Sequence, residues 1–393
     1  MGFSWSSSSR REKLVGMGWE HDRCMGPMLA AARAWASLRP GVEIEWSTRP
    51  LAAFNDQPLE ELARSFDLLV IDHPFAGTAA RTACLVPLDD LLPESDLAER
   101  AGDSVGRSHA SYAYEGRQWA LAVDAACQVA VARDDLLASH VQRAPETWEE
   151  VLALAAALPS RVAIPLYPTD AICSLLSLCT NLVTEAARGD SCFPDRDVGT
   201  RALALLSDLV PFLHPESFSF NPPRALDRMR DSDEIAYMPL VFGYTNYSRP
   251  ESGARARLRF LDIPSAGAGP VGSLLGGGGL AVSSRSRHSA EAAAFVAWAT
   301  GREAQAEVIF PAGGQPASRS AWLDPALDAA SGGFFSGTRA TIEAAHVRPR
   351  APWWPPFQEE AGHAVVRALQ GRERAEDAVV ELERLYRRAK SEV

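Results

Sequence analysis

The chain has 393 residues, more than one typical hydrophobic core needs, and this length suits two lobes or domains. Its composition, 47% hydrophobic and 23% charged residues, is that of a globular soluble protein. The net charge of −11 argues against general nucleic-acid binding, which needs a basic face. No stretch reaches the roughly 18 apolar residues that a membrane helix requires.

The first part of the chain predicts alternating strands and helices. Strands are expected at 13–19, 42–46 and 66–71, with helices over 26–38 and 58–65 between them. The third strand, FDLLVI, is apolar almost throughout, which is typical of a parallel strand buried on both faces. This order predicts an α/β fold with an open, mostly parallel sheet, in which ligands bind at the carboxyl ends of the strands.

Two polar clusters stand at such strand ends, one after the first strand and one after the third. Their residues are Trp19, Glu20, His21, Asp22 and Arg23 in the first cluster and Asp72 and His73 in the second. The alternative is ordinary helix capping and turn chemistry, and it is strongest for His73. Because the two clusters occupy equivalent positions, we favour a shared ligand site.

The middle of the chain predicts a second set of elements. Residues 143–158 (RAPETWEEVLALAAAL) form a helix that Thr147 caps, with Glu150 completing a capping box. The elements expected after it are a strand at 162–167, helices at 170–188 and 197–213, and strands within 231–247 and 257–264.

A glycine run at 276–279 precedes a short apolar strand, 280–282, and a helix that Ser289 caps. Bare backbone of this kind indicates that another group approaches the main chain closely; a tight loop beside a packed helix is the alternative. A further helical segment is expected at 302–309. Three earlier glycines match GxGxxG, but no helix begins at the last of them, so we reject a dinucleotide site. No cofactor or metal is expected.

The segment RPRAPWWPPF (348–357) predicts an extended, stiff chain that carries Trp353 and Trp354. One interpretation is a rigid surface strap with packed indoles. The other, which we favour, is an aromatic platform on which a ligand ring stacks.

Six cysteines, at 24, 84, 127, 173, 179 and 192, form no CxxC pair. A chain of this length folds without disulfides, so scattered buried thiols are expected, which mildly favours a reducing compartment. Residues 1–12 predict a flexible leader, and the N-terminal segment lacks an apolar core of signal-peptide length.

The ordered set of segments resembles the family 1 extracellular solute-binding proteins of ABC importers, of the maltose-binding, carbohydrate type. No single motif is diagnostic, and the resemblance extends from Lys13 to about Arg388. The segments that carry it are LVPLDDLLP (85–93), YEGRQWALAVDAACQVAVARD (114–134), the helix at 143–158, the glycine-rich strand with AAAFVAWATGREAQ (292–305), and the closing helix at 369–386.

The resemblance implies a type II periplasmic-binding-protein fold: two lobes, each a mostly parallel sheet flanked by helices, joined by three crossings. The implied N-terminal lobe is 13–123 plus 262–315, and the C-terminal lobe is 124–261 plus 316–393. Such a protein is not an enzyme: it is a monomeric substrate-binding component of an ABC transporter, whose lobes close about a hinge on a small solute. Its partners are the solute and the permease subunits, and its place is the periplasm or the cell surface. The lack of a signal-peptide core in the N-terminal segment conflicts with export. A cytoplasmic location for this member of the family therefore stays open.

The resemblance also implies the ligand contacts. Asp124 lies at the first crossing, and glycine backbone and indole faces join the polar clusters. The full set is Trp19, Glu20, His21, Asp22, Arg23, Asp72, His73, Asp124, Tyr167, Phe242, Tyr244, Gly277, Gly278, Trp353 and Trp354. The implied ligand is a sugar or sugar derivative.

Three alternatives stay open. Arg23 near a helix N-terminus would suit a carboxylate or phosphate, so an acidic solute is the first of them. An enzyme that uses Asp22, Asp72 and a neighbouring histidine as acid and base is the second. The third is an intracellular sensor that kept the clamp.

Overall fold

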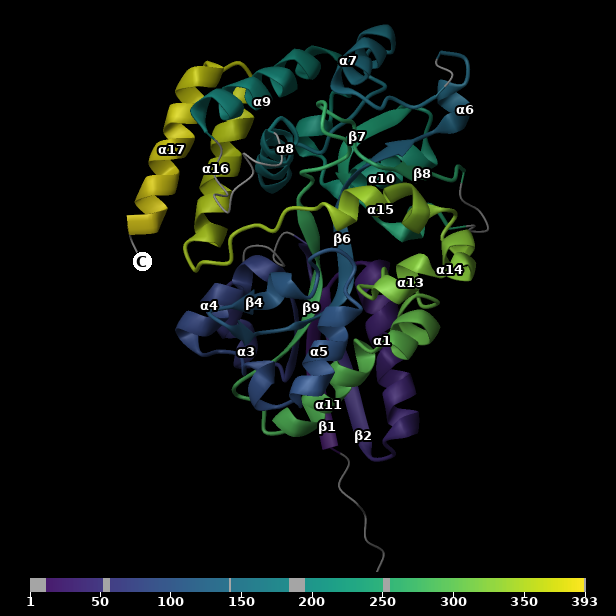
Figure 1. The fold of residues 1–393 in the computed structure, drawn as a ribbon, viewed down its shortest axis with the longest axis vertical. Coiled ribbons are helices and arrows are strands. Elements are labelled where there is room, and N and C mark those ends of the chain that lie inside the picture. The colour runs from purple at the N-terminus through teal and green to yellow at the C-terminus, as the bar shows by residue number, and fades with distance from the viewer. Residues whose placement is uncertain (1–11, 52–56, 141–142, 184–194, 250–254, 392–393) are drawn as a thin grey trace, which may run out of the picture.

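The computed structural model describes residues 12–51, 57–140, 143–183, 195–249 and 255–391, and the leader expected at 1–12 lies almost wholly outside them. The chain forms two lobes, which Figure 1 shows one above the other. Elements of the N-terminal lobe are β1 (Glu12–Trp19), α1 (Asp22–Leu38), β2 (Val42–Arg49), α3 (Leu59–Ala63), β3 (Leu68–Ile71), α4 (Ala76–Thr82), α5 (Glu94–Gly102), β4 (Ala113–Tyr114), β5 (Arg117–Gln118), β9 (Leu275–Val282), α11 (Ser289–Ala299) and α12 (Arg302–Ala304). Elements of the C-terminal lobe are α6 (Asp134–Leu137), α7 (Trp148–Ala157), α8 (Pro168–Asn181), α9 (Arg196–Leu209), α10 (Pro222–Asp231), β7 (Tyr237–Phe242), β8 (Arg259–Leu261), α15 (Phe334–Glu343), α16 (Trp354–Leu369) and α17 (Ala375–Ser391). The remaining elements are β6 (Leu121–Ala132), α13 (Arg319–Leu323) and α14 (Pro325–Ala330).

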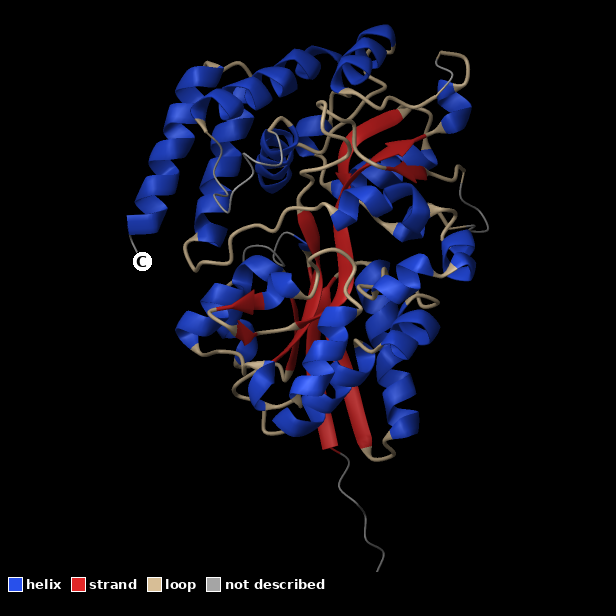
Figure 2. Ribbon diagram, viewed as in Figure 1, coloured by secondary structure: helices blue, strands red, loops and turns tan. Residues whose placement is uncertain are grey.

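A single mixed sheet runs through both lobes, as the red band in Figure 2 shows. Its order is β2-β1-β3-β9-β6-β7, with β8 also paired to β6. Among the strands of the described ranges, parallel pairing occurs only between β1 and β2 and between β1 and β3; β9 is antiparallel to both β3 and β6. The sheet is therefore less parallel than predicted, because β9 enters from the C-terminal lobe and runs opposite to the strands that begin in the N-terminal lobe.

Strand β6 belongs to both lobes. Its first half pairs with β9 from Leu121 to Cys127, and its second half pairs with β7 and β8 between Gln128 and Ala132. The chain returns between β8 and β9, and crosses again after residue 309 on its way to α15. These are the three crossings expected between the lobes.

The apolar strand β3 is buried on both faces, as predicted. Leu68 and Val70 face a cluster that contains Met28 of α1 and Phe295 of α11. The alternate residues Leu69 and Ile71 face a second cluster with α3 and α4. This two-residue alternation is what a pleated strand requires, and it explains why no polar residue occurs in the strand.

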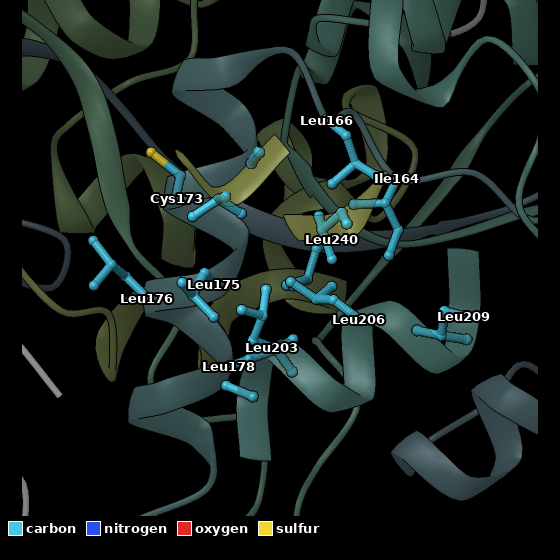
Figure 3. Packing of buried hydrophobic residues seen from close by; sticks show 14 of the residues in the cluster. Ile164, Leu166, Cys173, Leu175, Leu176, Leu178, Leu203, Leu206, Leu209 and Leu240 are labelled. Carbon is cyan, nitrogen blue, oxygen red and sulfur yellow. The ribbon is translucent and has the colours of Figure 1, made fainter. Parts of the chain in front are cut away.

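The C-terminal lobe is held by a cluster in which helices pack on one another. Leucines of α8 and α9 interdigitate there, and Leu240 of β7 contacts them, as Figure 3 shows. Helices α16 and α17 cover the far side of the same cluster. Thr147 caps α7 as predicted, with the Glu150 N–H donating to Thr147 Oγ1 at 3.2 Å. The return bond differs from the predicted capping box, because Glu150 Oε2 accepts from the N–H of Glu146, one residue before the cap, at 2.8 Å.

Several predicted boundaries were wrong. Helix α1 begins at Asp22, because His21 Nδ1 accepts a hydrogen bond from the Arg23 N–H and caps the helix before Pro27 is reached. The strand expected at 162–167 is reduced to isolated bridges at Val162. The helix expected at 170–188 is α8, which runs from Pro168 to Asn181. Helix α11 begins at Ser289, so its N-cap is His288 rather than the predicted Ser289, and the His288 side chain makes no cap bond.

The glycine run lies inside β9 rather than before it. Other groups occupy the space where side chains would be: a Cβ at Gly276 would meet the Phe242 ring at 2.8 Å, and one at Gly277 would meet the Asp124 carbonyl oxygen at 2.3 Å. Gly277 also has a φ of +124°, which L residues rarely adopt. The close approach predicted from the run is confirmed, and the approaching groups come from this chain.

The segment 348–357 is not an extended platform throughout. Helix α16 begins at Trp354, with Pro355 and Pro356 in its first turn, where a missing N–H costs no helical hydrogen bond. This start turns Trp354 into the core of the C-terminal lobe, where it is fully buried. The half-buried Trp353 packs edge-on against Tyr386 of α17, with ring centroids 5.3 Å apart.

Candidate functional site

A cavity of about 240 Å³ lies between the lobes. The N-terminal lobe supplies the ends of β1 and β3, the start of α1 and the glycine run of β9, and the C-terminal lobe supplies α8, the start of α10 and the end of β7. The lining residues are Trp19, Arg23, Leu51, Asp72, Ala126, Tyr167, Thr169, Asp170, Cys173, Ser219, Asn221, Pro222, Arg224, Phe242, Tyr244, Gly276, Gly277 and Arg348.

Arg23 and Asp124 form a buried ion pair behind the cavity. Arg23 Nε donates to Asp124 Oδ2 at 2.7 Å, and Nη2 donates to Oδ1. Nη1 donates to the carbonyl oxygen of Gly243 in the C-terminal lobe at 2.8 Å. Burial lowers the pKa of Arg23, yet the carboxylate outweighs burial, so the net pKa shift is upward and the guanidinium stays charged. Each guanidinium nitrogen therefore has a partner in this chain.

Aromatic rings surround this pair. The Arg23 guanidinium carbon lies 4.3 Å from the centroid of the Tyr244 ring, within cation–π range. His21 contacts Tyr244 edge-on, with centroids 4.8 Å apart. Burial, with a smaller contribution from Arg23, lowers the pKa of His21 to about 4, so this imidazole is neutral at pH 7.

Asp72 and Arg348 form a second buried pair. Arg348 Nη2 contacts Asp72 Oδ1 and Oδ2 at 2.9 and 2.7 Å, and Nη1 donates to Gln358 Oε1 at 3.1 Å. The His73 N–H donates to Asp72 as well. Burial would raise the pKa of Asp72, but Arg348 and His73 outweigh it and lower the pKa to about 2. The pair is ionised at neutral pH and ties the end of β3 to the segment before α16.

Four aromatic side chains, Trp19, Tyr167, Phe242 and Tyr244, line the cavity together with smaller apolar residues. The glycines of β9 make room for two of them, since a Cβ at Gly278 would meet Trp19 and one at Gly276 would meet Phe242. Tyr167 is 45% exposed and contributes the most open face. Aromatic faces beside hydrogen-bonding side chains suit a small polar solute with an apolar face.

The structure brings together seven of the fifteen predicted ligand residues on the cavity surface: Trp19, Arg23, Asp72, Tyr167, Phe242, Tyr244 and Gly277. Asp124 lies one layer behind it, held by Arg23, and Gly278 lies under Trp19.

The other predicted residues do not line the cavity. Glu20 and Asp22 are exposed on the outside of the turn that starts α1, and His21 is occupied as its cap. His73 is fully buried beside Asp72, where burial lowers its pKa to about 4. Trp353 and Trp354 pack in the C-terminal lobe because α16 begins at Trp354.

Sequence reasoning missed eleven of the lining residues. Arg348 belongs to the tryptophan-containing segment 348–357, and Gly276 belongs to the glycine run. Both could therefore have been predicted from the sequence. Thr169, Asp170 and Cys173 belong to α8, whose sequence predicts only a helix. The others are Leu51, Ala126, Ser219, Asn221, Pro222 and Arg224, which carry no local signal.

Within the described ranges, no group of three or more His, Cys, Asp or Glu side chains could hold a metal ion. The five described cysteines are free and buried, as expected, and Cys192 lies outside the described residues. Among the helices that the structure describes, none combines the length and apolar character needed to span a membrane.

Two lobes on one shared sheet, with a cavity lined from both, define a ligand-binding clamp. A family model described as bacterial extracellular solute-binding protein matches residues 58–332, which is most of the chain. The chain belongs to this family.

Solved structures of the same fold are similar over nearly their whole length. T. maritima MalE3 with maltose bound has a TM-score of 0.79 at 17% identity, covering 97% of this chain and all of that one. An Agrobacterium radiobacter K84 ABC transporter solute-binding protein in complex with ribitol has a TM-score of 0.78 at 20% identity, covering 94% and 97%. One from Agrobacterium vitis S4 with D-mannitol has a TM-score of 0.77 at 18% identity, covering 97% and 99%. No curated relative matches the chain. At these identities the likeness establishes the fold.

Proposed function

We propose that this protein is the substrate-binding component of an ABC transporter and that it holds a sugar or polyol in the cavity between its lobes. The observation that carries the proposal is the cavity itself, in which four aromatic faces stand beside hydroxyl, amide and carboxyl groups from both lobes. Each aromatic face buried against a sugar ring contributes about 1–3 kcal/mol by area. The structural relatives with maltose, ribitol and mannitol support the same ligand class.

A solute without an acidic group is favoured over an acidic one. The Nε, Nη1 and Nη2 of Arg23 already donate to Asp124 and Gly243, and both Nη atoms of Arg348 donate to Asp72 and Gln358. Within these two side chains, only Nε of Arg348, a buried atom with no hydrogen-bond partner among the described residues, is left for a carboxylate ligand. Any further contact would have to break these buried pairs, which is costly. The acid–base pair considered from the sequence is also disfavoured, because Asp22 is exposed away from the cavity.

The remaining parts of the proposal follow from the family. The protein acts as a receptor without catalysis, in the periplasm or at the cell surface, and delivers its solute to permease subunits as a monomer. Its lobes are 13–123 plus 262–315 and 124–261 plus 316–393, and closure moves one against the other about β6.

The first test is a thermal-shift screen of neutral sugars, polyols and organic acids. A solute that binds only the folded protein at 100 times its dissociation constant adds about 2.7 kcal/mol to the free energy of unfolding, which shifts the melting temperature measurably. We expect sugars or polyols to stabilise the protein and to make it more compact in small-angle scattering. Stabilisation by acids alone would contradict the ligand class, and no response to any solute would contradict the receptor.

The residue best suited to a matched test is Tyr167. We expect Tyr167→Ala to weaken binding of the solute found in the screen about tenfold, because an aromatic face worth about 1–3 kcal/mol is lost. The melting temperature without ligand should hardly change, since Tyr167 is 45% exposed. Leu323→Ala is the control, because Leu323 is 44% exposed but lies away from the cavity. Equal affinities of the two variants in calorimetric titration would show that Tyr167 does not contact the solute.

A further inference from the structure

Asp170 is a buried carboxyl group on the cavity surface. It is the third residue of α8, it is 8% exposed, and it lines the cavity. Among the residues that the structure describes, no donor makes a hydrogen bond or ion pair with its side chain. Its oxygens are not among the fully enclosed unpartnered atoms of the described residues, so the carboxyl remains accessible from the cavity and can receive a donor there.

The other charges around the cavity are already balanced or exposed. Arg23 is paired with Asp124, and Arg348 is paired with Asp72. Arg224 lies exposed at the rim, where its Nη1 donates to the Ser219 carbonyl oxygen at 3.1 Å. Asp170 is thus the acidic group on this surface, within the described ranges, that lacks a counter-charge.

The ionisable groups that interact electrostatically with Asp170 are Arg348, Cys173 and Tyr244. Of these groups only Arg348 lowers the pKa of Asp170, against the effect of burial, and Arg348 is already paired with Asp72. Burial therefore prevails and raises the pKa of Asp170 to about 8. Burial also raises the pKa of the Cys173 thiol to about 12 and that of the Tyr244 phenol to about 12, so both stay neutral. With the cavity empty at pH 7, Asp170 is mostly protonated.

The surroundings of Asp170 suit a cation from the solute. Trp19, Phe242 and Tyr244 line the same cavity, and aromatic faces attract positive charge. Tyr244 already receives the Arg23 guanidinium in this way. An ammonium group next to Asp170 would supply both the missing donor and the missing counter-charge.

We propose that the solute is a polyhydroxylated amine, such as an amino sugar or an aminopolyol, and that the Asp170 carboxylate receives its ammonium group. This inference rests on the proposed function and narrows its ligand class. Binding then takes place with release of the Asp170 proton to solvent, since the ammonium group stabilises the carboxylate. A neutral sugar or polyol whose hydroxyl groups bind the protonated Asp170 carboxyl would release no proton.

The experiment compares matched pairs by calorimetric titration at pH 7 in two buffers of different ionisation enthalpy. The first pair is sorbitol and its amine counterpart N-methyl-D-glucamine, and the second is D-glucose and D-glucosamine. N-acetyl-D-glucosamine is the control, because acetylation removes the charge of the amine. We expect the amine to bind at least about tenfold more tightly than its neutral partner, with release of close to one proton. Acetylation should abolish the preference.

Asp170→Asn keeps the shape of the side chain and removes its charge. In this variant the preference for the amine and the proton release should both disappear. Asp197→Asn is the control, because Asp197 also lies in the first turn of a helix of the same lobe, α9, but is exposed. This control should keep the affinity of the wild type.

The stability of Asp170→Asn shows independently that the variant folds. A carboxyl whose pKa is raised on folding stabilises the folded state below its unfolded pKa, near 4, and loses this contribution as the pH rises through about 8. Asp170→Asn should therefore melt at or above the wild-type temperature at pH 8.

Neutral partners that bind as tightly as the amines, or an Asp170→Asn variant with unchanged preference, would overturn the amine inference and leave the sugar receptor standing. A panel in which neither amines nor neutral solutes bind would contradict both.

Discussion

Replacing Arg348 by methionine is expected to lower the free energy of unfolding by about 3–5 kcal/mol, because it leaves Asp72 charged and buried without its partner. Arg348 and Asp72 are 4% and 6% exposed, and the guanidinium contacts both carboxylate oxygens. Methionine keeps much of the apolar stem of the arginine side chain. The loss of stability therefore measures the removal of the charge rather than the creation of a cavity. Urea denaturation of the wild type and the variant at pH 7 measures the difference.

The double variant tests whether the unpaired charge is the cause. Asp72→Asn together with Arg348→Met removes both charges, and it should recover most of the stability that Arg348→Met loses. The surface pair Arg143 and Glu150 serves as a control, because its guanidinium also contacts both carboxylate oxygens but is exposed. Arg143→Met should change stability little. A double variant no more stable than Arg348→Met would contradict this account.

The same pair predicts a pH dependence. The folded pKa of Asp72 is lowered to about 2, below the value near 3.9 of an unfolded chain, so the pair's contribution is complete above about pH 4 and is lost as the pH falls through 2. Between pH 4 and pH 2 the wild type should lose more stability than Arg348→Met. Parallel losses in the two proteins over this range would show that Asp72 is not held by Arg348.

The second large effect is expected at Gly277. Alanine at this position combines two costs: a φ of +124° that L residues rarely adopt, and a Cβ placed 2.3 Å from the carbonyl oxygen of Asp124. Each costs about 1–3 kcal/mol, so Gly277→Ala should lose more than about 3 kcal/mol of stability and should not bind solute. Chemical denaturation and titration with the solute from the screen measure the two losses.

Gly267 provides the matched control. Its φ is +120°, nearly that of Gly277, but a Cβ there would meet nothing within 4 Å. Gly267→Ala therefore bears the backbone cost alone, about 1–2 kcal/mol, and keeps binding. If the two variants lose equal stability, the close approach of β6 to β9 at Gly277 contributes nothing.

Local patterns were sufficient for much of the fold. The apolar run of β3 predicted a strand buried on both faces, because periodicity reports burial directly. Thr147 and Glu150 predicted the start of α7, because capping involves neighbours in sequence. The antiparallel direction of β9 was missed, since direction in a sheet depends on which lobe the chain comes from.

The site was predicted less completely, because its key contacts join distant parts of the chain. Asp72 was selected from the sequence, but Arg348, its partner 276 positions away, was not. Asp170 has the same helix-start chemistry as many acidic residues, and only its burial distinguishes it. The roles expected of Trp353 and Trp354 were wrong because the proline-rich segment 348–357 predicts an extended chain, whereas Pro355 and Pro356 lie in the first turn of a helix.

The position of β6 has a consequence for any attempt to dissect the protein. Strand β9 is covered by β3 on one side and by β6 on the other. A fragment cut before residue 121 that was complemented only with 262–315 would leave one side of β9 with unpaired N–H and C=O groups. Along Gly276, Gly277, Gly278 and Gly279 that edge carries no side chain to repel another strand, so such a fragment would offer a template for aggregation. We therefore expect the N-terminal lobe to avoid self-association only when it is expressed in one chain with β6.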